Sequence, residues 1–300
     1  MALARSTYPR FTIEVCRRNI LREPFCLIDI GVRGGIGDQW IHFGDHLQIL
    51  GFDPLFNDGV GPLIASNPHP DRWRYFNVAL GDKDEIRPFK FLPDNPSSSH
   101  FAASNGTDAA AVDGTWLPME LMKIDTLYSN GTIGSVDFVK MDAETYEIEI
   151  VRGGERFFSQ SGTFGIETET HFLRTPRNPR SHFAELYELL AAHRFNVYDA
   201  SGVRSPRSLI RHGLSDESRA VDYCRGAYGR SVVFDFLLLH DDFEHEAGQK
   251  QRSIDKLIKM IAVAEIYSLK DVGLDILFAN QDRLQSRLDV DEAADWLFHN

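Results

Sequence analysis

Short apolar runs that stop at a glycine or an acidic residue recur along this sequence, and they constrain its fold more than any other feature. The runs are FCLIDIG at 25–31, ILGFDP at 49–54 and VDFVKMD at 136–142. Runs of this length closed by turn signals are typical of strands that are buried on both faces of a parallel sheet. Because such a sheet needs helices on both sides, the pattern predicts an α/β fold.

The segments around these runs extend the expected sheet. Further strands or strand-like pieces are expected at 73–82, 86–93, 118–129, 163–172, 195–200 and 231–241. Helices are expected after the turn at 31–37, from Asp142 through Phe158, and at 181–195, although Gly44 weakens the first of them. The alternation predicts one parallel-sheet domain over residues 25–245.

The two ends of the chain have a different pattern. Residues 1–24 are predicted to be a polar lead-in with one short helix, whereas residues 246–300 have no strand pattern and are predicted to form about three helices. Ile254, Leu257, Ile258 and Ile261 form an apolar stripe at helical spacing. Either the sheet domain or a second copy of the chain must cover this stripe, and we expect a homodimer.

Composition excludes several classes of partner. The net charge of −12 argues against nucleic acid and against an anionic membrane surface. Cys16, Cys26 and Cys224 lie far apart without metal-binding spacing, so we expect reduced thiols. No signal peptide or span of ~20 apolar residues is evident, and we expect a cytoplasmic protein.

A glycine-rich turn follows the first predicted strand. Gly31, Gly34, Gly35 and Gly37 would let a ligand approach backbone N–H groups closely, although their spacing departs from G-x-G-x-x-G. Asp53 ends the second predicted strand, where an acid can accept hydrogen bonds from both ribose hydroxyls. Alone, the glycine-rich turn could be a tight connection without a ligand, and Asp53 could be an ordinary turn residue. Together, the two features predict a nucleoside-containing cofactor, either NAD or S-adenosylmethionine.

A cluster of acidic residues follows the strand predicted at 136–141. Asp142 would lie at the carboxyl end of a central strand, where open α/β sheets bind their ligands, and Glu144 lies two residues further on. Glu147 and Glu149 fall in the next helix, where they favour its N-terminal dipole. We interpret the first pair as functional and the second as helix capping and solvated surface.

An ordered series of motifs resembles the FkbM family of S-adenosylmethionine-dependent methyltransferases. The motifs are LIDIGVRGGIG (27–37), GFDPL (51–55), FNVALGD (76–82), SSSHF (97–101), KIDTL (123–127), VDFVKMDAETYEIEIVRGG (136–154) and GIETE (165–169). They run in the family's order over residues 25–200. Five positions depart from the family pattern. Thr145 replaces glycine, Val151 replaces leucine, and Asp53 stands where glutamate is usual. Arg33 and Gly34 replace a version of the turn with a small polar and an aromatic residue.

The resemblance implies a Rossmann-like class I methyltransferase sheet, here with a C-terminal helical extension. It also implies O-methylation of a hydroxyl on a sugar, polyketide or other small-molecule or glycan acceptor, with Asp142, Glu144 or His171 serving that acceptor. We rank His171 above His100 because it follows a strand end. The residues expected to hold S-adenosylmethionine are Asp29, Gly31, Gly34, Gly35, Gly37, Asp53, Asn77, Ala79 and Leu80.

Three alternatives stay open at this point. An NAD(P)-dependent oxidoreductase could use a similar sheet, but the glycine spacing and the lack of a recognisable hydride-transfer Tyr/Lys pair count against it. A non-catalytic cofactor-binding scaffold is conceivable because of Thr145 and the helical tail. A divalent metal ion is not favoured, although five side chains could supply hard ligands: Asp142, Glu144, Glu167, Glu169 and His171.

Overall fold

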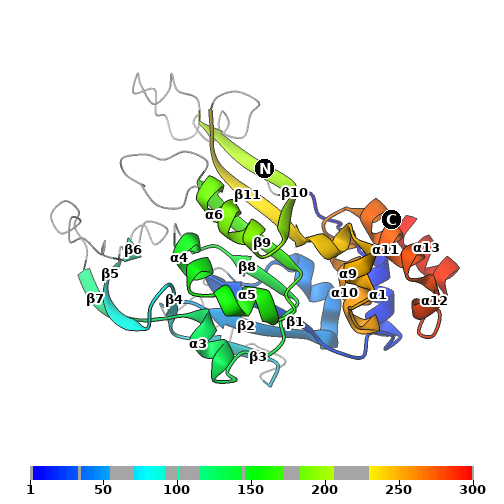
Figure 1. The fold of residues 1–300 in the computed structure, drawn as a ribbon, viewed down its shortest axis with the longest axis horizontal. Coiled ribbons are helices and arrows are strands. Elements are labelled where there is room, and N and C mark those ends of the chain that lie inside the picture. The colour runs from blue at the N-terminus through cyan, green and yellow to red at the C-terminus, as the bar shows by residue number, and fades with distance from the viewer. Residues whose placement is uncertain are drawn as a thin grey trace.

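A seven-stranded mixed sheet forms the centre of the computed structural model, which describes residues 3–32, 35–54, 71–91, 100–101, 115–143, 146–171, 183–205 and 230–298. The strands are β1 (Phe25–Ile30), β2 (Leu47–Phe52), β3 (Trp73–Phe76), β8 (Phe138–Met141), β9 (Gly165–His171), β10 (Phe195–Ser205) and β11 (Arg230–His240). Their order is β10-β11-β9-β8-β1-β2-β3, and β11 runs in the direction opposite to the other six strands (Figure 1). The predicted Rossmann-like sheet is confirmed.

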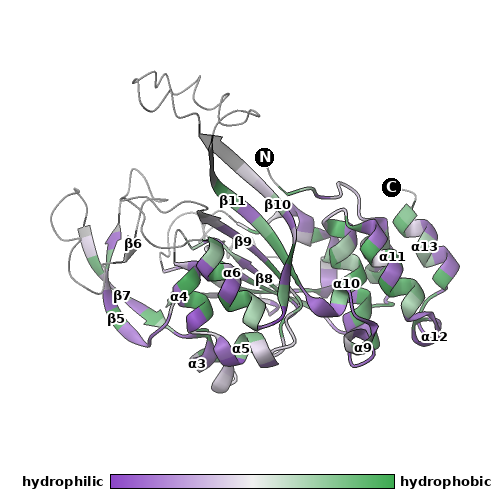
Figure 2. Cartoon of the chain, turned by 45° about the horizontal axis from the view of Figure 1, so that its top comes forward, coloured by the Kyte–Doolittle hydropathy of each residue, from purple (hydrophilic) through white to green (hydrophobic). Residues whose placement is uncertain are grey.

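Alternation along the central strands divides the interior into two apolar cores. In β1, Phe25 and Leu27 enter one core, whereas Ile28 and Ile30 enter the other. Every residue of β1 is buried, as the uninterrupted apolar run predicts for a central strand. Figure 2 shows hydrophobic and hydrophilic segments alternating along the helices, as amphipathic packing requires.

One face of the sheet is covered by short helices from the middle of the chain. These are α3 (Ile124–Ser129), α4 (Glu147–Arg152), α5 (Glu155–Gln160) and α6 (Phe183–Ala192). The single helix predicted through Phe158 is in fact two helices, α4 and α5, separated by Gly153 and Gly154. A Cβ on Gly153 would lie 1.9 Å from the carbonyl oxygen of Gly81, so close backbone contact sets this break.

Both ends of the chain cover the opposite face. Here α1 (Arg10–Arg17) and the 3-10 helix η2 (Asp38–His46) share a core with the C-terminal helices. The C-terminal elements are η4 (Asp241–Phe243), α9 (Glu246–Gln249), α10 (Ile254–Ile266), α11 (Lys270–Ala279), α12 (Gln281–Leu284) and α13 (Val290–Phe298). The predicted lead-in and helical extension therefore form one helical layer of the fold, because their apolar faces pack on Phe25, Leu27 and Phe138.

The apolar stripe that suggested a homodimer is buried within the single chain. Leu257, Ile258 and Ile261 are fully buried in α10, and Trp296 and Leu297 of α13 are at most 2% exposed. The alternative covering, by the chain's own sheet and α1, is the observed one. The homodimer stays a prediction that this stripe no longer supports. Among the described residues, no helix has the length and apolar content needed to cross a bilayer.

A second, four-stranded sheet was not anticipated from the sequence. It consists of β4 (Ala79–Leu80), β5 (Glu85–Phe91), β6 (His100–Phe101) and β7 (Thr115–Met122), in the order β4-β7-β5-β6 (Figure 1). The strand-like piece predicted at 118–129 is only half strand, because residues 124–129 form α3. Arg87 fastens this sheet to the main domain by contacting the hydroxyl of Tyr146, just before α4.

Candidate functional site

Four strand ends lie side by side where the strand order reverses. Ile30 of β1 pairs with Phe52 of β2 and Met141 of β8, and Phe52 pairs with Phe76 of β3. The residues that directly follow these pairs, which we call the carboxyl edge, are Gly31, Asp53, Asn77 and Asp142. Open α/β sheets bind ligands outside the carboxyl ends of their strands at such a reversal. The structure thus gathers residues from four separate sequence motifs.

Gly31 is fixed by backbone packing. Its φ is +85°, its N–H donates to the Phe52 carbonyl at 2.8 Å, and a Cβ would lie 2.0 Å from the Asp142 carbonyl oxygen. The Asp142 N–H in turn donates to Ile30 at 3.0 Å. Only glycine allows this conformation and this close approach of β1 and β8. The first glycine of the motif therefore has a structural reason that needs no ligand.

The rest of the glycine turn is described in part. Gly35 has a φ of +95° and donates to the Val32 carbonyl at 2.9 Å, whereas Gly34 lies outside the described residues. Gly37 precedes η2, and a Cβ there would lie 2.5 Å from the side chain of Gln39. The helix expected after the turn is a 3-10 helix that Gly44 interrupts with a φ of 51°. The turn therefore leads into 3-10 rather than α-helical backbone.

The residues predicted to hold the nucleoside differ in exposure. Asp53 is partly buried, and its N–H donates to Phe76 at 3.2 Å, which fixes it between the ends of β2 and β3. Asn77 is exposed. Ala79 and Leu80 are buried and pair with Leu121 and Met122 in the second sheet. Their side chains pack inside the protein, so only their backbone could border a ligand.

One residue earlier on each strand, a row of charged side chains crosses the sheet. Asp29 of β1 pairs in register with Lys140 of β8, which pairs with Glu167 of β9. Lys140 Nζ lies 3.2 Å from Asp142 Oδ2 and 3.7 Å from Asp29 Oδ1. The sequence reasoning missed Lys140, although strict alternation through Phe138, Lys140 and Asp142 places all three on one face.

Asp29 is the most perturbed acid at this edge. It is 1% exposed, and among the described residues its Oδ1 has no hydrogen-bond partner. Burial raises the pKa of Asp29 to about 7, against the attraction of Lys140 and with further repulsion from Asp142 and Glu167. A buried acid that titrates near neutral pH at the end of a central strand is a candidate ligand-binding group.

Glu167 ties distant parts of the chain to the same row. Arg5 donates to it at 2.5 Å, and the hydroxyl of Tyr267, directly after α10, donates to its other oxygen. Asp235 of β11 lies nearby, and burial, with repulsion from Glu167 and Asp142, raises the pKa of Asp235 to about 6. None of these contacts was predicted, because Arg5 and Tyr267 lie in segments that we interpreted as lying outside the sheet domain.

The residues predicted for the acceptor are described unevenly. Asp142 is partly exposed at the carboxyl edge, Glu144 lies outside the described residues, and the side chains of His100 and His171 do too. His171 ends β9 and pairs with Val233. Glu147 accepts the N–H of Ala143, which lies before α4, at 3.0 Å, and it is 1% exposed, so it is buried and not part of the solvated surface that we predicted.

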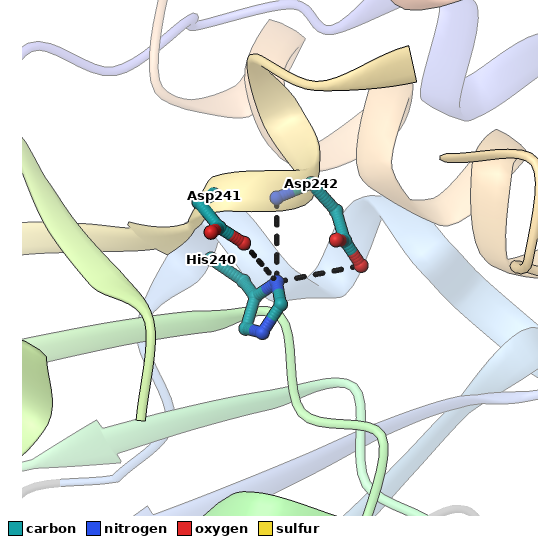
Figure 3. A group of neighbouring side chains, drawn as sticks. All are labelled: His240, Asp241 and Asp242. Carbon is teal, nitrogen blue, oxygen red and sulfur yellow. Dashed lines mark hydrogen bonds and ion pairs between the residues drawn. The ribbon is translucent and has the colours of Figure 1, made fainter. Parts of the chain in front are cut away.

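Metal-ligating side chains gather elsewhere. Among the described residues, the only group of three with suitable spacing is His240, Asp241 and Asp242 (Figure 3). The group lies at the opposite end of the sheet, because the backbone N–H of His240 donates a hydrogen bond to the carbonyl of Phe164, which directly precedes β9. Arg194 approaches Asp241 at 2.8 Å and Arg252 approaches Asp242 at 2.6 Å. Two guanidinium groups already balance these acids, so the cluster is a structural anchor for η4.

Comparisons with known proteins agree with the sequence motifs. A family model described as the methyltransferase FkbM domain matches residues 11–197, more than half of the chain. No curated protein sequence matched.

Several solved structures match this chain at low sequence identity. The methyltransferase FkbM from Methylobacillus flagellatus KT is 12% identical, with a TM-score of 0.39 over 78% of this chain and 48% of that protein. This chain therefore spans about half of its length. An S-adenosylmethionine-dependent methyltransferase from Mesorhizobium loti is 12% identical, with a TM-score of 0.39 over 74% and 95% of the two chains. The O-methyltransferase of a Brevibacillus brevis trans-AT PKS multienzyme, in complex with S-adenosyl-L-homocysteine, is 12% identical, with a TM-score of 0.38 over 96% and 82%.

Proposed function

Because this chain belongs to the FkbM methyltransferase family, we propose that it transfers a methyl group from S-adenosylmethionine to a hydroxyl oxygen of a small-molecule or glycan acceptor. The observation that carries the proposal is the carboxyl edge, where Gly31, Asp53, Asn77 and Asp142 follow paired strand ends. This is the position at which α/β sheets of this kind bind a nucleoside-containing ligand.

The described residues fit the proposed cofactor. Asp29 Oδ1 is buried without a hydrogen bond among the described residues, so it can accept one from a ligand's ammonium group. Gly31 and Gly35 adopt left-handed φ values that keep the turn free of side chains. Asp53, beside Asn77, presents a carboxylate that can accept hydrogen bonds from both ribose hydroxyls.

Each group then has a defined task. S-adenosylmethionine supplies an already activated methyl group, so the protein mainly has to align the acceptor oxygen with it. Residues 31–37 would border the methionine part, Asp53 would bind the ribose, and Asn77 would border the adenine. Asp142, with 39% of its side chain exposed, would orient the acceptor hydroxyl or take up its proton. Glu144 and His171 remain predictions for that second task.

Calorimetric titration with S-adenosylhomocysteine and with NADH tests the proposal. We expect the first ligand to bind and the second not to; the reverse would support an oxidoreductase. Asp53→Ala should weaken S-adenosylhomocysteine binding by about 1.5–3 kcal/mol, the range for a hydrogen bond to a charged group. Asp45→Ala is the matched control, because Asp45 is an exposed acid in η2 that pairs with Arg72.

Unchanged affinity in Asp53→Ala would remove this residue from the ribose site. A methyl-transfer assay against hydroxylated acceptors then distinguishes an enzyme from a non-catalytic scaffold. Binding of S-adenosylhomocysteine without turnover of any acceptor would favour the scaffold.

A further inference from the structure

Lys140 occupies the centre of the charged row below the carboxyl edge. It lies on β8, between Asp29 on one neighbouring strand and Glu167 on the other, and it reaches forward to Asp142. Among the described residues, it is the one cation within ion-pair distance of Asp29 or Asp142. No step of the function proposed above uses it.

The neighbouring acid does not compete for this ammonium group. Glu167 already receives Arg5 and the Tyr267 hydroxyl, one on each carboxylate oxygen. Lys140 therefore directs its hydrogen bond to Asp142 Oδ2 at 3.2 Å and its remaining attraction to Asp29 Oδ1. One lysine thus links the acid proposed to meet the cofactor with the acid proposed to meet the acceptor.

We propose that Lys140 is a positioning residue, which holds the carboxylate of Asp29 in the charged row and the carboxylate of Asp142 at the carboxyl edge in place. The proposal rests on the function proposed above, because it gives the two carboxylates ligand-binding tasks. Two like charges on adjacent strands repel each other, and a shared cation between them offsets that repulsion. Lys140 itself stays protonated: burial opposes its charge, but Asp29, Asp142 and Glu167 together raise the pKa of Lys140.

Other charged and titratable groups face this network from every side, and none of them replaces Lys140. They are Tyr75 from β3, Glu167 from β9, Asp235 from β11, Arg5 from the N-terminal segment and Tyr267 after α10. All but Arg5 are acids or phenols, and Arg5 is engaged by Glu167. Removal of Lys140 should therefore raise the pKa of Asp29 above its present value of about 7.

The test compares Lys140→Met with the charge-conserving Lys140→Arg. Lys259→Met is the matched control, because Lys259 is another buried lysine, paired with Asp137 at the other end of β8. In Lys140→Met, we expect affinity for S-adenosylhomocysteine to fall about tenfold at pH 6.5 and by less than about twofold at pH 8.5, as a rise of about one pKa unit in Asp29 requires. Lys140→Arg should show the wild-type pH dependence of this affinity, and Lys259→Met should not change that pH dependence.

A purely structural lysine would give a different result. Its loss would weaken binding equally at both pH values, and that outcome would overturn the proposal. A second measurement is a pH titration of the ligand-free variants followed by carboxyl carbon NMR. We expect the titration midpoint of Asp29 to be at least about one pH unit higher in Lys140→Met than in the wild type. An unchanged midpoint would also overturn it. A wild-type chain that binds no S-adenosylhomocysteine would instead reject the proposed function, and the NMR midpoint would then decide the role of Lys140.

Discussion

Two buried aspartates lie at opposite ends of the same pair of strands, and their surroundings differ. Asp137 directly precedes β8 and is 2% exposed; it receives the Cys26 N–H at 2.8 Å and the ammonium groups of Lys256 and Lys259. Asp29, near the end of β1, is 1% exposed and has only Lys140, at 3.7 Å, within ion-pair distance among the described residues. Asp137 therefore has a hydrogen bond and two ion pairs, whereas Asp29 has a single, longer ion pair.

This difference separates a structural end of the sheet from the end at which we propose that the cofactor binds. A buried charge costs free energy unless it is paired and hydrogen-bonded. At the start of β8, α10 supplies both lysines, so Asp137 anchors the helical layer to the sheet. In the charged row below the carboxyl edge, Asp29 Oδ1 has an ion pair with Lys140 but no hydrogen bond among the described residues, and a bound ammonium group could supply that hydrogen bond.

The largest expected effect comes from removing the structural end altogether. Truncation after His245 deletes α9 to α13 and should abolish cooperative folding, because these helices cover one face of β1, β2 and β8. Each large buried side chain contributes roughly 1.5–3 kcal/mol, against a total stability of about 5–15 kcal/mol for a domain. Near-ultraviolet circular dichroism and thermal unfolding would show the loss. A truncated chain that unfolds cooperatively would mean that the sheet does not need this layer.

A smaller effect is expected from Asp137→Ala. The substitution leaves Lys256 and Lys259 buried without their shared carboxylate, and breaking a buried pair in this way costs about 3–5 kcal/mol. Urea unfolding would measure the loss, and affinity for S-adenosylhomocysteine, measured where the variant is folded, should stay unchanged. Loss of affinity without loss of stability would reverse the roles that we assign to the two ends.

The smallest effect is a difference in pH dependence. Burial raises the pKa of Asp29 to about 7 from 3.8, so folding binds a proton between these values and stability contributed by this group falls as pH rises from about 4 to about 7. Burial opposes the charge of Asp242, but hydrogen bonds from His240 and Arg252 lower its pKa to about 2. The contribution of Asp242 to the free energy of unfolding is therefore present above about pH 4 and is lost as the pH falls towards 2.

Two asparagine variants should separate these contributions. Asp29→Asn should flatten the stability profile between about pH 4 and 7, and Asp242→Asn should flatten it between about pH 4 and 2. Chemical unfolding across the pH range is the measurement. A profile that Asp29→Asn leaves unchanged would show that this acid does not titrate near neutral pH.

Residues close together in sequence were the predictable part of the molecule. The apolar run FCLIDIG became β1, and the run after Asp137 became β8, because a strand buried on both faces leaves a local record in the sequence. The carboxyl edge followed from these strand ends, since the residue after a buried strand must lie at its rim.

Contacts between distant residues were the unpredictable part. Helix α10 carries Lys256, Lys259 and Glu265 among its apolar residues, which gives it the sequence pattern of an amphipathic helix. These three side chains are buried or partly buried because their partners lie far away in sequence, at Asp137 and at the N-terminus of α1. The periodicity of a helix shows which of its residues are polar, but it does not show which distant residues they contact in the fold.

The bond between the two ends of the chain has a consequence for protein synthesis. Glu265 accepts the N–H groups of Phe11 and Thr12, and Phe11 lies 254 residues earlier in the sequence. A domain usually begins to fold while it leaves the ribosome, but here β1 and α1 emerge long before the helix that covers them. The apolar face of β1 must therefore wait until α10 has been translated. We expect the nascent chain to depend on chaperones until α10 has emerged.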